Sequence, residues 1–323
     1  MSSPFLRVSL AFGLAAVSAF ACSSSDNNRV APTTQDASSD AKADATHVAT
    51  DHGLTLSSCD EDRIEKDQGN LVYRTIETAG GSRSFQLLRP ENVKCTLKAP
   101  LVILVHGALP KATVTKNPGD YFANLLGYPD DASANGYILA APHGLSVDGD
   151  FLLSADKEND MTFISDLIDA VTLKEPVNPK RVYVVGYGEG GAVALKAACD
   201  FSSRVSGVES VAGGLLKSTK AACTPSESVS IALASGSGDK VISPDGDDNY
   251  EPFQDAFDFL IGAMKCTDDE TNTTDGDANI TTHEKCDNSA QIRKLQVPNA
   301  SHEKMTDWLQ PLYSDFLKKR FKS

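Results

Sequence analysis

Short apolar runs that end at glycine, histidine or proline constrain the fold of this chain more than any other feature. The clearest runs are residues 101–105, 137–141, 181–185 and 229–234, and residues 291–297 form a weaker fifth candidate. Continuous apolar runs of this length are typical of strands that are buried on both faces of a parallel sheet. The first run ends at His106-Gly107, the second stops at Pro142, and the third leads into a glycine-rich turn.

Helical patterns separate these runs. Residues 161–171 place their apolar side chains at helical spacing, and the alanine-rich residues 192–199 also favour a helix. A further helix is expected over residues 305–316, with a kink at Pro311. Strands alternating with helices predict an α/β fold with a mostly parallel, doubly wound sheet. Ligands bind such sheets at the C-terminal ends of the strands, so functional side chains are expected just after the apolar runs.

The N-terminus carries an export signal. In residues 1–21 a single charge, Arg7, precedes an apolar stretch that ends at a small-residue cleavage site. Cys22 follows directly, which resembles a bacterial lipoprotein signal in which this cysteine is lipidated. We therefore expect an exported lipoprotein at the outer membrane or cell surface, held to the membrane by its lipid anchor only. Ordinary secretion, or release into the periplasm, is the alternative.

Residues 22–58 are rich in serine, aspartate, alanine and threonine and contain few large apolar side chains. Such a segment buries too little surface to offset the entropy of ordering it, so it is expected to be a disordered tether. Residues 59–323 then form a single domain. They contain enough apolar residues to form a buried core, because 41% of the whole chain is hydrophobic.

The net charge of −14 argues against a nucleic-acid partner, which would need a basic surface. Residues 239–287 alone contain 14 acidic and 3 basic residues. Two parts of this segment, 245–248 and 275–279, resemble calcium-binding stretches, but position 6 of an EF-hand loop starting at Asp275 would be Ile280 instead of glycine. The segment is thus expected to be a solvated acidic insertion, and we predict neither a metal nor a cofactor.

Six cysteines remain after Cys22, and an even number in an exported chain predicts disulfides. Fifteen pairings are possible, and the sequence does not choose among them. The simplest set joins neighbours along the chain: Cys59–Cys95, Cys199–Cys223 and Cys266–Cys286.

The strongest motif follows the strand at residues 181–185. Gly186-Tyr187-Gly188-Glu189-Gly190 has the strand–turn–helix context and both flanking glycines of the G-x-S-x-G nucleophile elbow. The central serine of that motif, however, is replaced by Gly188. Since the elbow residue is held in a strained conformation that glycine adopts freely, this replacement keeps the turn and relieves strain.

Residues 160–169, 178–186 and 190–199 resemble the polyhydroxybutyrate depolymerase and feruloyl esterase family of secreted α/β-hydrolases. The resemblance extends more weakly over residues 70–320, where the family also has a strand ending in His-Gly. It implies an α/β-hydrolase fold and a lineage of carboxylic-ester hydrolases that act on polyesters or plant-polysaccharide esters. A Gly-x-x-Asp acid loop corresponds to residues 236–239, and a late histidine corresponds to His302.

Chain order supports the same assignment, because α/β-hydrolases present nucleophile, acid and base in that order. Here the order is Gly188, Asp239 and His302, with Asp239 as the acid and His302 as the base. The oxyanion hole would use the backbone N–H of Glu189 and one N–H after His106-Gly107, which we place at Ala108. The side chain of Glu189 is expected to point away from the site.

Other interpretations of these residues stay open. His106 favours a structural role at a strand end, Asp239 could serve a turn, and His302 could simply precede a helix. Another serine could attack in place of the missing one; Ser235, Ser237 and Ser301 are near the acid or the base in sequence.

The sequence therefore predicts a catalytically impaired ester-hydrolase homologue that retains a binding site for an ester or polymer ligand. One alternative is an active hydrolase that uses a different nucleophile or an activated water. The other is a surface lipoprotein with a structural or interaction role. A single tryptophan, Trp308, and the absence of an aromatic residue just after His302 weaken the case for a polymer substrate.

Overall fold

The computed structural model describes residues 69–112, 114, 117–267 and 269–320, all within one compact unit, Thr55–Ser323. The predicted signal peptide, Cys22 and the predicted tether lie outside the described residues. Among the residues that are described, no helix is long and apolar enough to cross a membrane.

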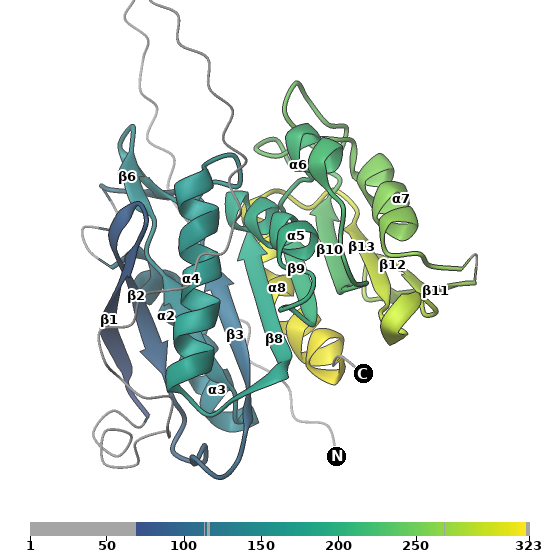
Figure 1. Cartoon of the computed structure of the whole chain (residues 1–323). Helices are drawn as coiled ribbons and strands as arrows, with labels where there is room; N and C mark the ends of the chain where they lie inside the picture. The colour runs from purple at the N-terminus through teal and green to yellow at the C-terminus, as the bar shows by residue number, and fades with distance from the viewer. Residues whose placement is uncertain (1–68, 113, 115–116, 268, 321–323) are drawn as a thin grey trace, which may run out of the picture. The chain divides into compact units, whose positions relative to one another are not determined.

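A ten-stranded sheet forms the centre of this unit (Figure 1). Its strands in chain order are β1 (Leu71–Thr78), β2 (Gly81–Leu88), β3 (Ala99–Val105), β5 (Ile138–Pro142), β8 (Val177–Tyr187), β9 (Gly207–Val211), β10 (Ser230–Gly236), β11 (Glu270–Asp275), β12 (Ala278–His283) and β13 (Ile292–Val297). In space they follow the order β1-β2-β5-β3-β8-β9-β10-β13-β12-β11. The six strands from β5 to β13 in that order are parallel, and an antiparallel hairpin flanks them on each side.

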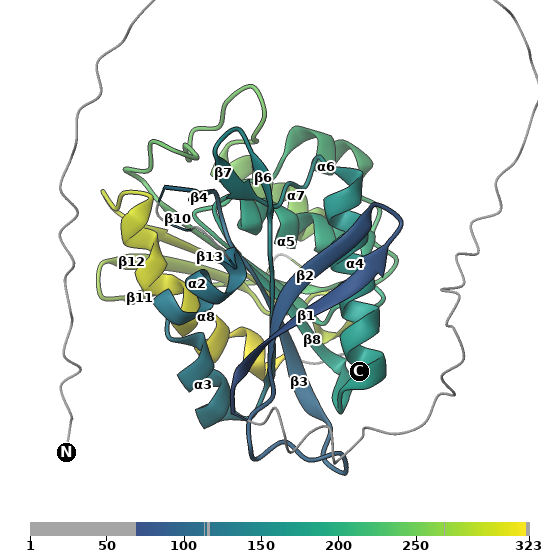
Figure 2. The ribbon, with the colours of Figure 1, turned by 90° about the vertical axis from the view of Figure 1, so that its left-hand side faces the viewer.

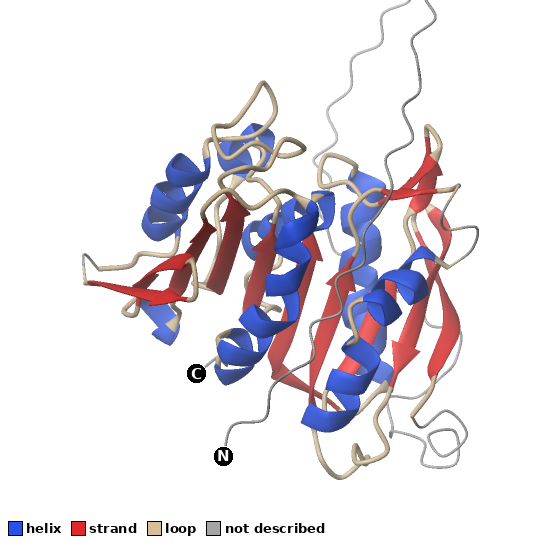
Figure 3. Cartoon of the chain, turned by 180° about the vertical axis from the view of Figure 1, so that it is seen from behind, coloured by secondary structure: helices blue, strands red, loops and turns tan. Residues whose placement is uncertain are grey.

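Helices cover both faces of the sheet, as the doubly wound prediction requires (Figure 2). One layer contains α4 (Glu158–Lys174), α5 (Glu189–Asp200), α6 (Lys217–Ala222) and α7 (Phe253–Ala263). The other contains α2 (Pro118–Leu125), α3 (Tyr128–Asn135) and α8 (Leu309–Asp315), and the view of Figure 3, from behind that of Figure 1, turns this face towards the viewer. A small second sheet consists of β4 (Leu109–Pro110), β6 (Leu145–Val147) and β7 (Asp150–Leu152).

The central strands carry two apolar cores, one on each face of the sheet. All seven residues of β3 are buried, because alternate side chains enter opposite cores. Leu101, Ile103 and Val105 belong to the core on one face, and Val102 and Leu104 to the core on the other. The predicted strands at 101–105, 137–141, 181–185, 229–234 and 291–297 are thus confirmed, with boundaries shifted by up to four residues.

The C-terminal segment differs from the prediction. Instead of one kinked helix, the chain forms a 3₁₀ turn at Glu303–Trp308 (η2), then α8, then a second 3₁₀ turn at Leu317–Lys319 (η3). Pro311 is the third residue of α8, where the first turn needs no intrahelical N–H donor. The proline is therefore accommodated near a helix start and does not kink a longer helix. A third 3₁₀ turn, η1 (Asp287–Ser289), precedes β13.

Two buried ion pairs fix β2 and its C-terminal extension to the helix α4. Arg83 Nη1 lies 2.9 Å from Asp160 Oδ1, and both side chains are almost fully buried. Arg89 Nε donates to Glu175 Oε2 at 2.8 Å, at the C-terminal end of α4. Asp160 also accepts the N–H of Ser154, so this carboxylate is held from two sides.

Two of the three predicted disulfides are present, Cys199–Cys223 and Cys266–Cys286. Cys95 is also disulfide-bonded, and its predicted partner, Cys59, lies outside the described residues. The acidic residues 239–287 are built into the unit as α7 and the β11–β12 hairpin, which extends the sheet. In the described part of the chain, no group of three or more His, Cys, Asp or Glu side chains is placed to hold a metal ion.

Candidate active site

The turn between β8 and α5 has the geometry of a nucleophile elbow. A Cβ on Gly186 would overlap the carbonyl oxygen of Gly190, and a Cβ on Gly190 would overlap that of Val105. These two flanking positions therefore admit only glycine. Gly188 is at the tip of the turn, with φ 57° and ψ −126°, a backbone conformation that strains any residue with a side chain.

Gly188 faces the imidazole of His302. A Cβ added at Gly188 would lie 3.4 Å from His302 Nε2 and 3.7 Å from the Cα of Gly107. Both are ordinary contact distances, so a serine there would bring its hydroxyl within reach of this nitrogen. Position 188 is thus where a nucleophile would be placed, and in this chain it carries no side chain.

The predicted acid and base are paired. Asp239, at the end of the strand β10, accepts a hydrogen bond from His302 Nδ1 at 2.8 Å. Its other oxygen accepts the backbone N–H groups of Val241 at 2.8 Å and Ile242 at 3.1 Å. Only 1% of Asp239 is exposed, so the carboxylate is fixed in place. This arrangement puts the proton on Nδ1 and leaves Nε2 free to accept a proton on the side of Gly188.

Tyr187 also positions His302, a role that the sequence analysis did not identify. Its hydroxyl donates to the backbone carbonyl of His302 at 2.8 Å, and the two ring centroids are 4.8 Å apart. Burial raises the pKa of this hydroxyl, and the carboxylates of Glu303, Asp239 and Glu189 raise it further. The hydroxyl therefore stays protonated and remains a donor.

The two predicted oxyanion donors flank the same position. Glu189 is the first residue of α5, where a helix leaves its N–H groups without intrahelical partners. Ala108 follows the strand β3, but its N–H donates to Oε2 of the Glu189 side chain at 3.2 Å. The side chain of Glu189 was expected to point away from the site. Instead, it points towards Ala108 in the loop after β3.

The alternative serines are either hydrogen-bonded to other groups or buried in a strand. Ser237 Oγ accepts the N–H of Asn299 at 2.7 Å, and the Ser301 hydroxyl is hydrogen-bonded to the carboxylate of Glu303. Ser165, in the helix α4, accepts a hydrogen bond from Arg204 at 2.7 Å. Ser235 is buried in β10. Among the described residues, no serine hydroxyl is hydrogen-bonded to His302.

His106 and His283 make hydrogen bonds to backbone groups and not to Asp239. His106 donates from Nδ1 to the carbonyl of Gly107 at 2.6 Å and accepts the N–H of Gly144 at Nε2 at 2.9 Å. Burial lowers the pKa of His106 to about 4, so it is neutral near pH 7. His283 is on β12, where its Nδ1 contacts the carbonyl of Thr267 at 3.0 Å. His302, and not His283, is therefore the residue paired with Asp239.

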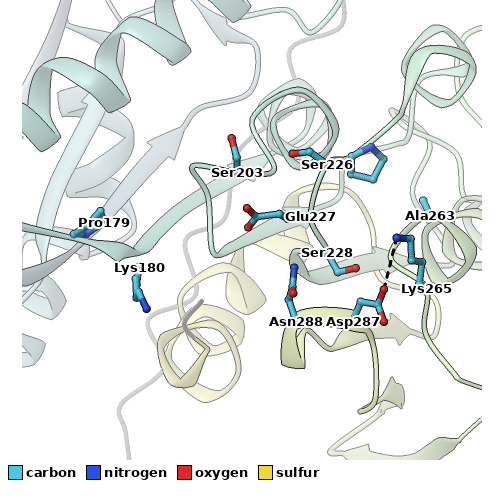
Figure 4. Close-up of a pocket in the computed structure, with 11 residues that line it drawn as sticks. Pro179, Lys180, Ser203, Ser226, Glu227, Ser228, Ala263, Lys265, Asp287 and Asn288 are labelled. Carbon is cyan, nitrogen blue, oxygen red and sulfur yellow. Dashed lines mark ion pairs between the residues drawn. The ribbon is translucent and has the colours of Figure 1, made fainter. Parts of the chain in front are cut away.

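A cavity lies away from these groups. It has a volume of about 560 Å³, and its lining includes Lys180, Ser228 and Asn288 (Figure 4). These residues lie near the N-terminal ends of β8, β10 and β13, whereas Gly188 follows the C-terminal end of β8. The cavity thus opens at the opposite edge of the parallel sheet. Its lining carries opposite charges, with Lys265 and Asp287 paired at 3.6 Å.

Comparison with solved structures identifies the fold. A thermostable esterase aligns with a TM-score of 0.54 at 14% identity, covering 78% of this chain and 63% of the other. An acetyl xylan esterase from Aspergillus awamori gives 0.53 at 12% identity, over 74% and 99% of the two chains. A ferulic acid esterase from Anaeromyces mucronatus gives 0.50 at 12% identity, over 78% and 90%. These likenesses confirm the predicted α/β-hydrolase fold.

Sequence comparison gives the family. The chain is 27% identical over 176 residues to a protein named "Putative esterase NocK" from Nocardia uniformis subsp. tsuyamanensis, over 54% of this chain. The match spans about half the length of that relative, 50%. The family described as phospholipase/carboxylesterase matches residues 148–310, a range that contains Gly188, Asp239 and His302. The chain therefore belongs to the phospholipase/carboxylesterase family of α/β-hydrolases.

Proposed function

We propose that this protein is a catalytically impaired carboxylesterase homologue that keeps its acid–base pair and serves as a ligand-binding protein. The placement of Gly188 against His302 Nε2, with 3.4 Å from the nitrogen to the position of a Cβ, is the observation that carries the proposal. It supports a site from which one functional group, the serine hydroxyl, has been removed while its partners keep their geometry.

The remaining chemistry follows from these partners. His302 can accept a proton at Nε2, and Asp239 stabilises the imidazolium that forms. Without a hydroxyl at position 188 no acyl-enzyme can form there, and only a water could attack. Removing a member of such a triad costs roughly 10⁴-fold or more in rate. Ester turnover in this chain is accordingly slow.

The ligand class is proposed from the lineage. The similar proteins are named as esterases, including those for acetyl xylan and ferulic acid, which favours a ligand that bears a carboxylic ester. A polyester or other insoluble polymer is the weaker candidate. Trp308 is half-buried against the core, so it offers no freely exposed aromatic surface for gripping a polymer.

The location is proposed from the N-terminal sequence and the cysteines. The signal over residues 1–21 and Cys22 favour an exported lipoprotein, anchored by its acyl chains. The disulfides Cys199–Cys223 and Cys266–Cys286 favour an oxidising compartment, which agrees with export.

Hydrolysis of p-nitrophenyl acetate and butyrate tests the proposal. The wild type, Gly188→Ser, His302→Ala and the combination of the two are compared in the same purified form. We expect at most very slow hydrolysis by the wild type and clearly faster hydrolysis by Gly188→Ser, which the added His302→Ala abolishes. The serine hydroxyl would then be the missing group.

Two other results would contradict the proposal. Wild-type hydrolysis that is as fast as that of Gly188→Ser and that His302→Ala abolishes would show an efficient different nucleophile or activated water, the first alternative. Inactivity of every variant, together with no binding of a non-hydrolysable ester analogue to the wild type, would favour a structural or interaction role.

A further inference from the structure

We propose that Glu189 closes the oxyanion hole with its own carboxylate and so blocks ester chemistry independently of the missing serine. The inference rests on the proposed function, because it concerns the same site and a second reason for its impairment. It makes Glu189 a residue that withholds one hydrogen-bond donor from the oxyanion that forms during ester hydrolysis.

The backbone N–H of Ala108 is placed where an oxyanion hole needs its second donor. Ala108 follows His106-Gly107, and both ring nitrogens of His106 are hydrogen-bonded to backbone groups. The Cα of Gly107 lies 3.7 Å from the position of a Cβ on Gly188. The loop is therefore fixed beside the elbow, where the second N–H of an oxyanion hole belongs. The N–H of Ala108 is that donor, and Glu189 Oε2 accepts its hydrogen bond at 3.2 Å.

A carboxylate at this place has two effects. An oxyanion hole lowers a barrier because its donors are free to stabilise the negative charge that develops in the transition state. A carboxylate that accepts one of these hydrogen bonds removes the donor and adds a negative charge where another must form. Both effects oppose the tetrahedral intermediate, and neither depends on which residue occupies position 188.

A helix-capping role explains only part of the observation. Acidic residues in the first turn of a helix are stabilised by the helix dipole, and Glu189 is the first residue of α5. That effect accounts for the residue type but leaves the half-exposed side chain free to face solvent. Within the described part of the chain, Glu189 has no ion-pair partner that would turn it towards Ala108. The contact with the Ala108 N–H is what places its carboxylate in the site.

The kinetic test compares three variants that all carry the serine: Gly188→Ser alone, with Glu189→Ala, and with Glu303→Ala. Glu303 is the matched control, since its carboxylate also acts on Tyr187 and it is not the acceptor of the Ala108 hydrogen bond. Freeing one oxyanion donor should raise kcat by about 10²-fold. We expect this rise for Glu189→Ala with little change in KM, because the hydrogen bond from the freed Ala108 N–H to the substrate oxygen strengthens in the transition state. Glu303→Ala should change kcat by less than about three-fold.

A second measurement is independent of catalysis. The amide proton resonance of Ala108 is followed by NMR in the wild-type background and in its Glu189→Ala and Glu303→Ala variants. Loss of a hydrogen bond to a carboxylate moves an amide proton upfield, so we expect that shift for Glu189→Ala only. Melting curves of all variants check that each is folded.

Two results would overturn the inference. One is an Ala108 resonance that does not respond to Glu189→Ala, since the contact would then be absent. The other is a resonance that moves while Gly188→Ser and Gly188→Ser/Glu189→Ala are equally active or equally inert, since the hole would then not be limiting. His302-dependent hydrolysis by the wild type that is as fast as that of Gly188→Ser would contradict the proposed function instead, and the NMR result would still decide this inference.

Discussion

Two hydrogen bonds hold His302 in a fixed orientation. Asp239 fixes the ring through Nδ1, and the Tyr187 hydroxyl fixes the backbone carbonyl of the same residue. A base that is oriented in advance pays little entropy when a substrate arrives. His302 thus has a fixed orientation opposite Gly188, as the proposed function requires.

The pH dependence of stability should report His106. Burial holds the pKa of this imidazole at about 4, against an ordinary value of 6.5. The unfolded chain therefore takes up the proton first, and stability falls as the pH decreases from about 6.5 to about 4. Each such proton contributes a slope of up to about 1.4 kcal/mol per pH unit.

Urea unfolding at a series of pH values checks this expectation. Burial likewise lowers the pKa of His143 to about 4, so wild-type stability should fall with the contribution of both histidines. His106→Asn keeps a donor for the Gly107 carbonyl and removes one titrating group, so its slope over this pH range should be smaller. A slope equal to that of the wild type would show that His106 does not titrate on unfolding.

Among single residues, the sequence predicts those whose role depends on their order along the chain or on the lack of room for a Cβ. Gly186, Gly190, Asp239 and His302 follow from the elbow motif and from the order of acid and base. The contact of Glu189 with Ala108 cannot be predicted from the sequence, because the rotamer of a long side chain depends on neighbours that are distant in the chain. The contact of Tyr187 with the carbonyl of His302 was missed for the same reason.

Among the elements, the flanking hairpins are the least predictable from sequence. The strand β1 alternates between half-buried and exposed residues, and every residue of β11 is exposed. Such strands lack the continuous apolar runs that identify β3 and β10, because at least one of their faces is in water.

The ion pair between β2 and α4 should be important for stability. Arg83→Met leaves Asp160 buried without its charged partner, and breaking a buried pair in this way typically costs about 3–5 kcal/mol. Lys196→Met is the matched control, since it breaks the more exposed pair with Asp200 within α5. That change should cost no more than about 1 kcal/mol.

Urea unfolding of both methionine variants at neutral pH measures these two free energies. Similar losses for Arg83→Met and Lys196→Met would show that the buried pair contributes no more than a surface pair. That result would contradict the role assigned to Arg83.

For the molecule as a whole, the two disulfides that have both cysteines in the described residues close loops of similar length. The paired cysteines are 24 residues apart in Cys199–Cys223 and 20 apart in Cys266–Cys286. If each bond acts mainly by restricting the unfolded chain, the two contributions should be nearly equal, at about 3 kcal/mol each. Cys199→Ser/Cys223→Ser and Cys266→Ser/Cys286→Ser should therefore lower the free energy of unfolding by similar amounts.

Denaturant titrations of the two double-serine variants decide this point. Losses that differ by more than about 2 kcal/mol would show that local packing outweighs loop closure. The wild type under reducing conditions provides the reference in which every accessible disulfide is open.

The hydrogen bond between Ala108 and Glu189 also affects how ester hydrolysis could arise in this chain by successive substitutions. Replacing Glu189 first would yield no gain in hydrolysis, because position 188 has nothing with which to attack. Replacing Gly188 by serine first would yield only part of the gain, because Glu189 would still accept the hydrogen bond of the Ala108 N–H. Selection for ester hydrolysis would reward the two changes together far more than either one alone. If the proposed function holds, such epistasis between neighbouring positions would make efficient ester hydrolysis hard to reach by single substitutions.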